Sequence, residues 1–209
     1  EWGIKTMVRQ PALKIAILGW GSLIWDRRPE FDDQHEQWEP DGPLLKLEFS
    51  RISESRQGAL TLVIDDVHGE ECRVQYALSK RRRLEDAIAD LRCREGTVLR
   101  RIGNYRADGS DQGAPPVPDA IKAWVAGQGF YAVIWTGLPS NFKEFRKKQE
   151  LPDEAAEFSV DNAIAHIRGL SCEAKAKAAT YVWSAPDYVN TPLRRALQAA
   201  PWFTQPASE

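Results

Sequence analysis

The segment IAILGWGSL, residues 15–23, is an apolar run that ends in two glycines on either side of a tryptophan. A short apolar run bounded by glycine predicts a buried β-strand followed by a tight loop. Glycine gives such a loop conformations that other residues avoid, and it lets a ligand approach the backbone N–H groups closely. We therefore consider residues 19–23 either a small binding loop or a plain tight turn.

The loop does not match the glycine-rich loops that hold phosphates. A Walker loop needs Gly-x-x-x-x-Gly-Lys-Ser/Thr, which does not occur in the sequence. A dinucleotide fingerprint needs a third glycine at the position of Ile24. If the loop binds anything, we expect a small polar ligand held by the backbone.

Composition limits the classes of partner. The 209 residues are 43% hydrophobic and 28% charged, as in a globular protein, and the formal net charge is −2. The sequence therefore predicts no nucleic-acid partner, and the run Lys80–Arg83 is interpreted as the solvated start of a helix. No stretch approaches the roughly 18 consecutive apolar residues of a membrane span, and residues 1–6 lack the apolar centre of a signal peptide. We expect no membrane partner.

Cysteine and histidine usage predicts neither disulfides nor a metal. Cys72, Cys93 and Cys172 are widely spaced and form no C-x-x-C pair, which is typical of reduced thiols in a cytoplasmic protein. The three histidines lie far apart in the sequence, so a zinc site is not expected. We predict that the protein uses no metal and no cofactor. The sequence gives no indication of the oligomeric state.

Strand patterns dominate the first half of the chain and helical patterns the last third. After residues 15–19, strands are predicted at 44–49, 58–64, 72–78 and 130–135. Helices are predicted at 79–94, with Ser79 as a possible N-cap, at 119–126, 153–168 and 172–183, and after Pro192. Residues 108–116 are rich in turn-forming residues and predict a surface loop. This order predicts an α+β fold with a mixed β-barrel or curled sheet and helices packed outside it.

The expected domain organisation is simple. Residues 1–13 are predicted to be an N-terminal extension, and residues 14–209 a single domain whose helical part starts at about residue 150.

Glu95 is the strongest candidate for chemistry. Leu84, Ile88 and Leu91 recur at helical spacing, and Glu95 continues the same stripe toward the core. The helix C-terminus and partial burial both disfavour the ionised carboxylate, so the pKa of Glu95 should be raised. Such a carboxyl group can take and give a proton near neutral pH. Gly96 directly after it is a helix stop signal.

Ordinary structural roles for these residues stay open. Glu95 could rotate into water at a frayed helix end, or form an ion pair with Arg92, Arg94 or Arg51. Arg51 itself follows a predicted strand, where it could bind a substrate carboxylate in a bidentate manner or form a surface ion pair.

Taken together, these segments resemble a bacterial branch of the gamma-glutamylcyclotransferase-like fold family. Trp20–Leu23 stands where the family has a Tyr-Gly-Ser loop after an early strand. Arg94–Gly96 stands where the family has a Glu-Gly pair at a helix end. The stretch from Phe49–Ser53 through Ala59–Val63 also resembles this branch, and the resemblance covers roughly residues 14 to 140.

The resemblance implies an enzyme that cyclises a gamma-glutamyl group to 5-oxoproline and releases an amino acid or amine. It implies no metal, a proton shuttle at Glu95 and a gamma-glutamyl small molecule as the partner. The substrate-binding residues would be Gly19, Trp20, Gly21, Ser22, Leu23 and Arg51. Trp20 replaces the usual Tyr and Leu23 replaces an Asn that many members carry, and both changes alter the expected pocket.

A function of another class is a binding module without turnover. Trp20, Trp25, Trp38 and Trp135 could form an aromatic groove for a peptide or a partner protein. An exposed Glu95 far from the loop would favour this alternative, whereas a Glu95 that closes a pocket floored by Gly21 and Ser22 would favour the enzyme.

Three further residues have side chains that could take part in chemistry. Ser22 lacks the G-x-S-x-G elbow of hydrolytic serines. Cys93 is expected to be a packing or surface thiol. His166 is expected on a helix surface or in its last turn rather than as a ligand.

Overall fold

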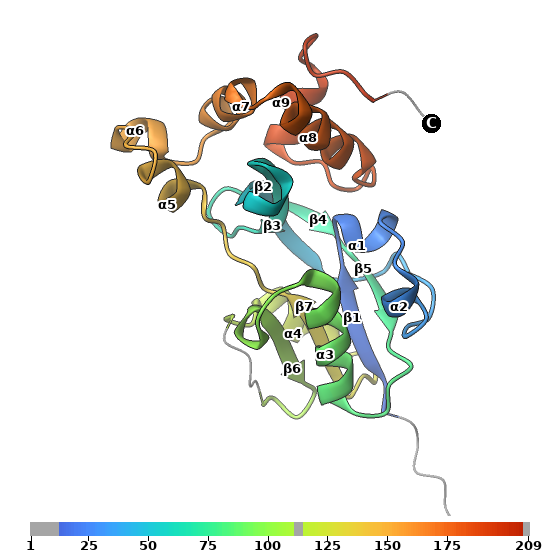
Figure 1. The fold of residues 1–209 in the computed structure, drawn as a ribbon. Coiled ribbons are helices and arrows are strands. Elements are labelled where there is room, and N and C mark those ends of the chain that lie inside the picture. Colours follow the sequence, from blue (N-terminus) through green and yellow to red (C-terminus); the bar gives the residue numbers. More distant parts are fainter. Residues whose placement is uncertain (1–12, 111–114, 207–209) are drawn as a thin grey trace, which may run out of the picture.

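The computed structural model describes residues 13–110 and 115–206, and it has the predicted α+β composition (Figure 1). The predicted extension 1–13 lies outside the described residues except for Leu13, as do residues 111–114 of the predicted loop. The strands are β1 Ile15–Gly19, β2 Leu44–Ser53, β3 Ala59–Ile64, β4 Glu70–Arg73, β5 Gln75–Leu78, β6 Ile102–Arg106 and β7 Ala132–Thr136. The helices are α1 Ser22–Trp25, α2 Pro29–Asp32, α3 Leu84–Glu95, α4 Asp119–Val125, α5 Phe142–Lys147, α6 Asp153–Ala156, α7 Val160–Gly169, α8 Cys172–Ser184 and α9 Pro192–Gln198, with 3-10 turns η1 Glu54–Arg56 and η2 Leu99–Arg101.

The strands of the described residues form two separate sheets, so the expected β-barrel or curled sheet is wrong in this respect. One sheet has the order β5-β1-β7-β6 and the other β3-β2-β4. The chain changes sheets at Val74, whose N–H donates to Pro43 O and whose carbonyl accepts from the N–H of Gly42. The sequence predicted one strand over residues 72–78. The structure divides this segment at Val74 into the end of β4 and the whole of β5.

Strand β1 is buried on both faces, as its continuous apolar sequence predicted. It pairs in parallel with β7 and antiparallel with β5. Ile15 and Ile17 pack with Leu91 of α3 in one hydrophobic cluster, whereas Ala16 and Leu18 belong to a larger cluster on the other face. This alternation follows from the two-residue period of a strand. A strand clamped in this way gives the following loop a fixed starting point.

Helix α3 begins at Leu84 rather than next to Ser79. Ser79 is not the N-cap, because its N–H donates to Ile15 O and the residue forms a β-bridge with His35. The end of the helix agrees with the prediction: Glu95 is the last residue, and Gly96 adopts the left-handed conformation with φ 58°.

Strand β6 has no clear pattern in the sequence and was not predicted. It contains Gly103 and Asn104, which are both weak strand formers. Gly103 is required by packing, since a Cβ atom there would overlap the ring of Trp135 on the neighbouring strand. The tertiary contact therefore decides the residue at this position.

The C-terminal helices α7, α8 and α9 lie over the sheet that contains β2 and β3 (Figure 1). The predicted helix 153–168 is divided into α6 and α7, because Ser159 caps α7 by accepting the N–H of Asn162. His166 is buried rather than on the surface, with its Nε2 2.8 Å from Gly58 O. In the described parts of the chain, no helix has both the length and the apolarity needed to span a bilayer.

Candidate functional site

The loop after β1 depends on Gly21. This residue has φ 65° and ψ −149°, a combination open almost only to glycine, and it opens the short helix α1. A Cβ atom at this position would lie 2.7 Å from the hydroxyl oxygen of Tyr181 on α8. Glycine is therefore required both by the backbone and by the packing of a helix 160 residues away.

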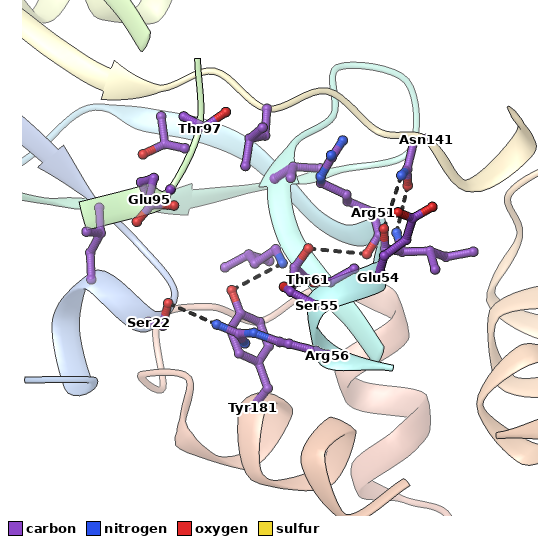
Figure 2. A pocket seen from close by; sticks show the side chains of 18 of the residues that line it. Ser22, Arg51, Glu54, Ser55, Arg56, Thr61, Glu95, Thr97, Asn141 and Tyr181 are labelled. Carbon is purple, nitrogen blue, oxygen red and sulfur yellow. Dashed lines mark hydrogen bonds between the residues drawn. The ribbon is translucent and has the colours of Figure 1, made fainter. Parts of the chain in front are cut away.

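A cavity of about 430 Å³ opens beside this loop (Figure 2). It is bounded by the loop, the end of α3, the end of β2 with η1, the segment after β7, and α8. The described residues that line it are Trp20, Ser22, Leu23, Arg51, Ile52, Ser53, Glu54, Ser55, Arg56, Thr61, Leu62, Val63, Glu95, Gly96, Thr97, Thr136, Leu138, Asn141 and Tyr181.

The structure thus brings five of the seven sequence-predicted site residues to one cavity: Trp20, Ser22, Leu23, Arg51 and Glu95. The other two predicted residues, Gly19 and Gly21, pack against side chains outside the loop. A Cβ atom on Gly19 would overlap the ring of Trp38, and one on Gly21 would meet Tyr181. Neither glycine is among the residues that line the cavity.

Glu95 lies at the cavity wall with its carboxyl group largely buried. Its side chain is 17% exposed, and Oε1 has no hydrogen-bond partner among the described residues. Burial raises the pKa of Glu95, and the opposing charge of Arg94, with Nη1 4.0 Å from Oε1, limits that rise. Arg56 and Arg28 act on the pKa in the same direction as Arg94, but more weakly. A proton is therefore held on this carboxyl group to higher pH than on an ordinary glutamate.

A second buried glutamate, Glu48, has a structural role and provides a comparison for Glu95. Burial also raises the pKa of Glu48. Its two oxygens, however, accept the N–H groups of Phe49 at 2.8 Å and of Leu193 at 3.2 Å, which ties β2 to α9. Glu48 has no exposed surface and does not line the cavity. Glu95 differs from it in lining the cavity and in having one buried oxygen without a hydrogen-bond partner among the described residues.

Arg94 joins Glu95 to the loop, a role that the sequence did not indicate. Its guanidinium is buried and donates to Ser22 O at 3.1 Å and to Asp26 O at 2.9 Å. The end of α3 is thereby fixed against α1, and the loop and Glu95 keep one relative position. Sequence reasoning named Arg94 only as an ion-pair partner of Glu95, because its contacts to residues 22 and 26 are long-range.

Arg56 and Tyr181 are functional candidates that the sequence analysis missed. The guanidinium of Arg56 lies 4.1 Å from the ring centroid of Tyr181 and donates to Ser22 Oγ at 3.3 Å (Figure 2). Tyr181 is buried, its hydroxyl accepts the N–H of Leu62 at 3.5 Å, and burial raises its pKa. Arg56 is consequently held over a neutral aromatic ring, and among the described residues its guanidinium donates to no acceptor other than Ser22 Oγ.

Arg51 stands on a stretch of β2 that is fixed from two sides. Its carbonyl accepts from Thr61 Oγ1, and Asn141 pairs with the backbone of Ile52 through two hydrogen bonds of 2.7 and 3.0 Å. The guanidinium donates from Nη1 to Pro139 O at 2.8 Å. Burial, followed by the charge of Arg101, lowers the pKa of Arg51.

The residues at the cavity suit proton transfer and anion binding better than metal or nucleophilic chemistry. None of the lining residues described above is a histidine or a cysteine, and Ser22 Oγ faces a guanidinium instead of a base. In residues 13–110 and 115–206, no three His, Cys, Asp or Glu side chains are grouped so that they could hold a metal ion.

Comparison of the chain with protein-family models, with curated proteins and with solved structures found no match.

Proposed function

We propose that the cavity is the active site of a gamma-glutamylcyclotransferase-like enzyme, which converts gamma-glutamyl compounds to 5-oxoproline and releases an amino acid or amine. The observation that carries the proposal is Glu95: a buried carboxyl group with a raised pKa and a free oxygen, in the same cavity as the loop Trp20–Leu23. The family resemblance of the sequence supplies the reaction. The free thiols of Cys72, Cys93 and Cys172 suit the reducing cytoplasm that we propose as its location.

The proposed reaction needs one proton carrier and accurate positioning. The α-ammonium group of the substrate gives one proton to Glu95, and the resulting amine attacks the γ-carbonyl carbon, so that a C–N bond forms and the ring closes. The bond from that carbon to the leaving nitrogen then breaks as Glu95 gives its proton to this nitrogen, and the ring nitrogen releases its second proton, which the departing amine takes up. Nucleophile and electrophile belong to one molecule, and the protein gains rate mainly by holding them in a reactive conformation.

A carboxyl group with a raised pKa is suited to both halves of this exchange. An ordinary glutamate is ionised at neutral pH and holds a proton too weakly to return it efficiently. Burial shifts the pKa of Glu95 upward, toward neutral pH, and the positive charges of Arg94 and Arg56 oppose part of this shift. The group can therefore serve as base first and as acid afterwards.

The loop and Arg56 are the proposed binding site for the glutamyl group. Arg56 stands next to Ser22, and a guanidinium pairs well with a carboxylate such as the one on the α-carbon of the substrate. Trp20 and Leu23 give this end of the cavity apolar walls at the two positions where the sequence departs from the family loop.

The aromatic-groove alternative has less support. Trp20 and Trp135 are 6% and 1% exposed and belong to the larger core. Trp25 packs edge-on against Tyr181, and Trp38 packs against the other hydrophobic cluster. The four tryptophans are thus used for packing at different places, and we do not propose a groove built from them.

The test is turnover by wild type and by Glu95→Gln. Gln keeps the shape of the side chain but cannot act as a general acid or base near neutral pH. We expect wild type to release 5-oxoproline from gamma-glutamyl dipeptides or amines, and Glu95→Gln to lose about 10²- to 10⁴-fold in kcat. Glu85→Gln removes an exposed carboxylate from the same helix and serves as the matched control. Near-normal turnover by Glu95→Gln, or no 5-oxoproline from a broad substrate panel with wild type, contradicts the proposal.

A further inference from the structure

The cavity contains two guanidinium groups with different neighbours. Arg56 contacts Ser22 and Tyr181, which places it at the loop that we assign to the glutamyl group. Arg51 stands in another part of the cavity, beside Asn141 and Glu54 in the view of Figure 2. Of the two, Arg56 is the one whose charge acts on Glu95. One cation thus acts on the charge of the proton carrier, whereas the other has its own neighbours in the same cavity.

Most N–H groups of the Arg51 side chain have no acceptor among the described residues. A guanidinium carries five N–H groups, and within residues 13–110 and 115–206 the acceptor that Arg51 reaches is the carbonyl of Pro139. No carboxylate of these residues lies within ion-pair distance of it, although Glu54 also lines the cavity. Partial burial and the nearby charge of Arg101 lower the pKa of Arg51, and the carboxylate of Glu54, outside ion-pair distance, offsets this only in part.

The backbone around Arg51 is rigid, which favours a binding role over an adaptable surface charge. Thr61 Oγ1 donates a hydrogen bond to the carbonyl of Arg51. The side-chain amide of Asn141 forms two hydrogen bonds with the backbone of Ile52, as the backbone of a neighbouring strand would. Ser140 Oγ donates to Ser50 O on the preceding residue of the same strand. Binding of a ligand therefore needs no ordering of the backbone here, and the entropy cost is confined to the side chain.

We infer that Arg51 binds a carboxylate on the leaving group, so that the substrates are gamma-glutamyl amino acids or peptides and not neutral gamma-glutamyl amines. This inference rests on the proposed function. Arg56 takes the carboxylate of the glutamyl half, and the scissile bond then lies between the two cations and within reach of Glu95. A planar guanidinium can donate two parallel hydrogen bonds to the second carboxylate, and a carboxamide in the same place cannot accept both.

The experiment compares two substrates that differ only in this group: gamma-glutamyl-alanine and gamma-glutamyl-alaninamide. For wild type we expect kcat/KM to be about tenfold or more higher for the acid, as for the loss of one charge-assisted pair. In Arg51→Met this ratio should fall close to one, mainly through a higher KM for the acid. Arg100→Met removes an exposed arginine outside the cavity and should keep the wild-type ratio.

Direct binding to Glu95→Gln, measured by calorimetry, separates the inference from turnover. The variant should bind the acid about tenfold more tightly than the amide, and adding Arg51→Met should remove this difference. Equal binding of the two compounds, or binding of neither, overturns the inference. If 5-oxoproline forms from both compounds at equal rates, the inference fails and the proposed function stands. If the acid binds preferentially but no 5-oxoproline forms, the proposed function fails and the carboxylate site remains.

Discussion

Replacing Gly21 with alanine tests the structural basis of the loop. The backbone conformation of Gly21, φ 65° and ψ −149°, costs a non-glycine residue about 1–3 kcal/mol. The added Cβ atom would also lie 2.7 Å from the hydroxyl oxygen of Tyr181, and relief of such an overlap costs about 1–3 kcal/mol more. We expect Gly21→Ala to lower the free energy of unfolding by about 2–6 kcal/mol in total.

The assay is urea unfolding followed by tryptophan fluorescence, since the chain has eight tryptophans and Trp20 adjoins the mutated residue. Gly129→Ala is the matched control: Gly129 has φ 67°, and no heavy atom lies within 4 Å of its added Cβ. The control should cost about 1–2 kcal/mol, from backbone conformation alone.

The contact with Tyr181 can be isolated by a double-mutant cycle. Tyr181→Phe alone should cost about 1 kcal/mol, because its hydroxyl accepts one long hydrogen bond from Leu62. In the Gly21→Ala background the same change removes the overlapping atom, and it should recover about 1–3 kcal/mol. The reasoning is refuted if Gly21→Ala costs no more than Gly129→Ala, or if Tyr181→Phe gives no recovery.

Two further predictions concern the end of α3. Arg94→Met removes the donor to Ser22 O and Asp26 O and should lower the free energy of unfolding, measured by urea unfolding, by about 2–4 kcal/mol. The control Arg92→Met, at an exposed position of the same helix, should change this free energy by less than about 0.5 kcal/mol. Equal effects of the two variants would show that the contacts of Arg94 to the loop are unimportant. The second prediction concerns pH. Because burial raises the pKa of Glu95 above its usual 4.5, the unfolded state loses this proton at lower pH than the folded state. The contribution of the carboxyl group is therefore fully present below pH 4.5 and is lost as the pH rises through the folded pKa. Unfolding of wild type and Glu95→Gln at a series of pH values should show wild type losing stability relative to the variant over this window, by at most about 1.4 kcal/mol per pH unit, and a constant difference would contradict the raised pKa.

Local patterns in the sequence were sufficient for the elements that carry the two main site features. The apolar run 15–19 predicted a buried strand, and β1 occupies those residues. The spacing of Leu84, Ile88 and Leu91 placed Glu95 on the core face of a helix, and Gly96 marked the helix end. These predictions succeed because strand and helix periodicity and glycine conformation depend on neighbouring residues only.

Local patterns failed where the chain exchanges partners. Nothing in 72–78 shows that Val74 pairs with the turn at residues 42–43 and sends the chain into a second sheet. Strand β6 escaped prediction because Gly103 is selected by the ring of Trp135, a residue 32 positions later. The expected mixed β-barrel or curled sheet was wrong for the same reason, since the chain forms two sheets: strand content is local, but strand pairing is not.

The sequence by itself determined the candidate proton carrier and the loop, since both are encoded in short segments. Only the tertiary structure decided what surrounds them. Arg94 reaches back to residues 22 and 26, and Arg56 rests on Tyr181, which belongs to the C-terminal helices. Burial and nearby charges set the pKa of Glu95: Arg94 is its neighbour in the sequence, but Arg56 and Arg28 belong to distant segments. Desolvation and charge act through space, so these properties of the site follow from the packing of the whole chain and not from the motif that contains the carboxylate.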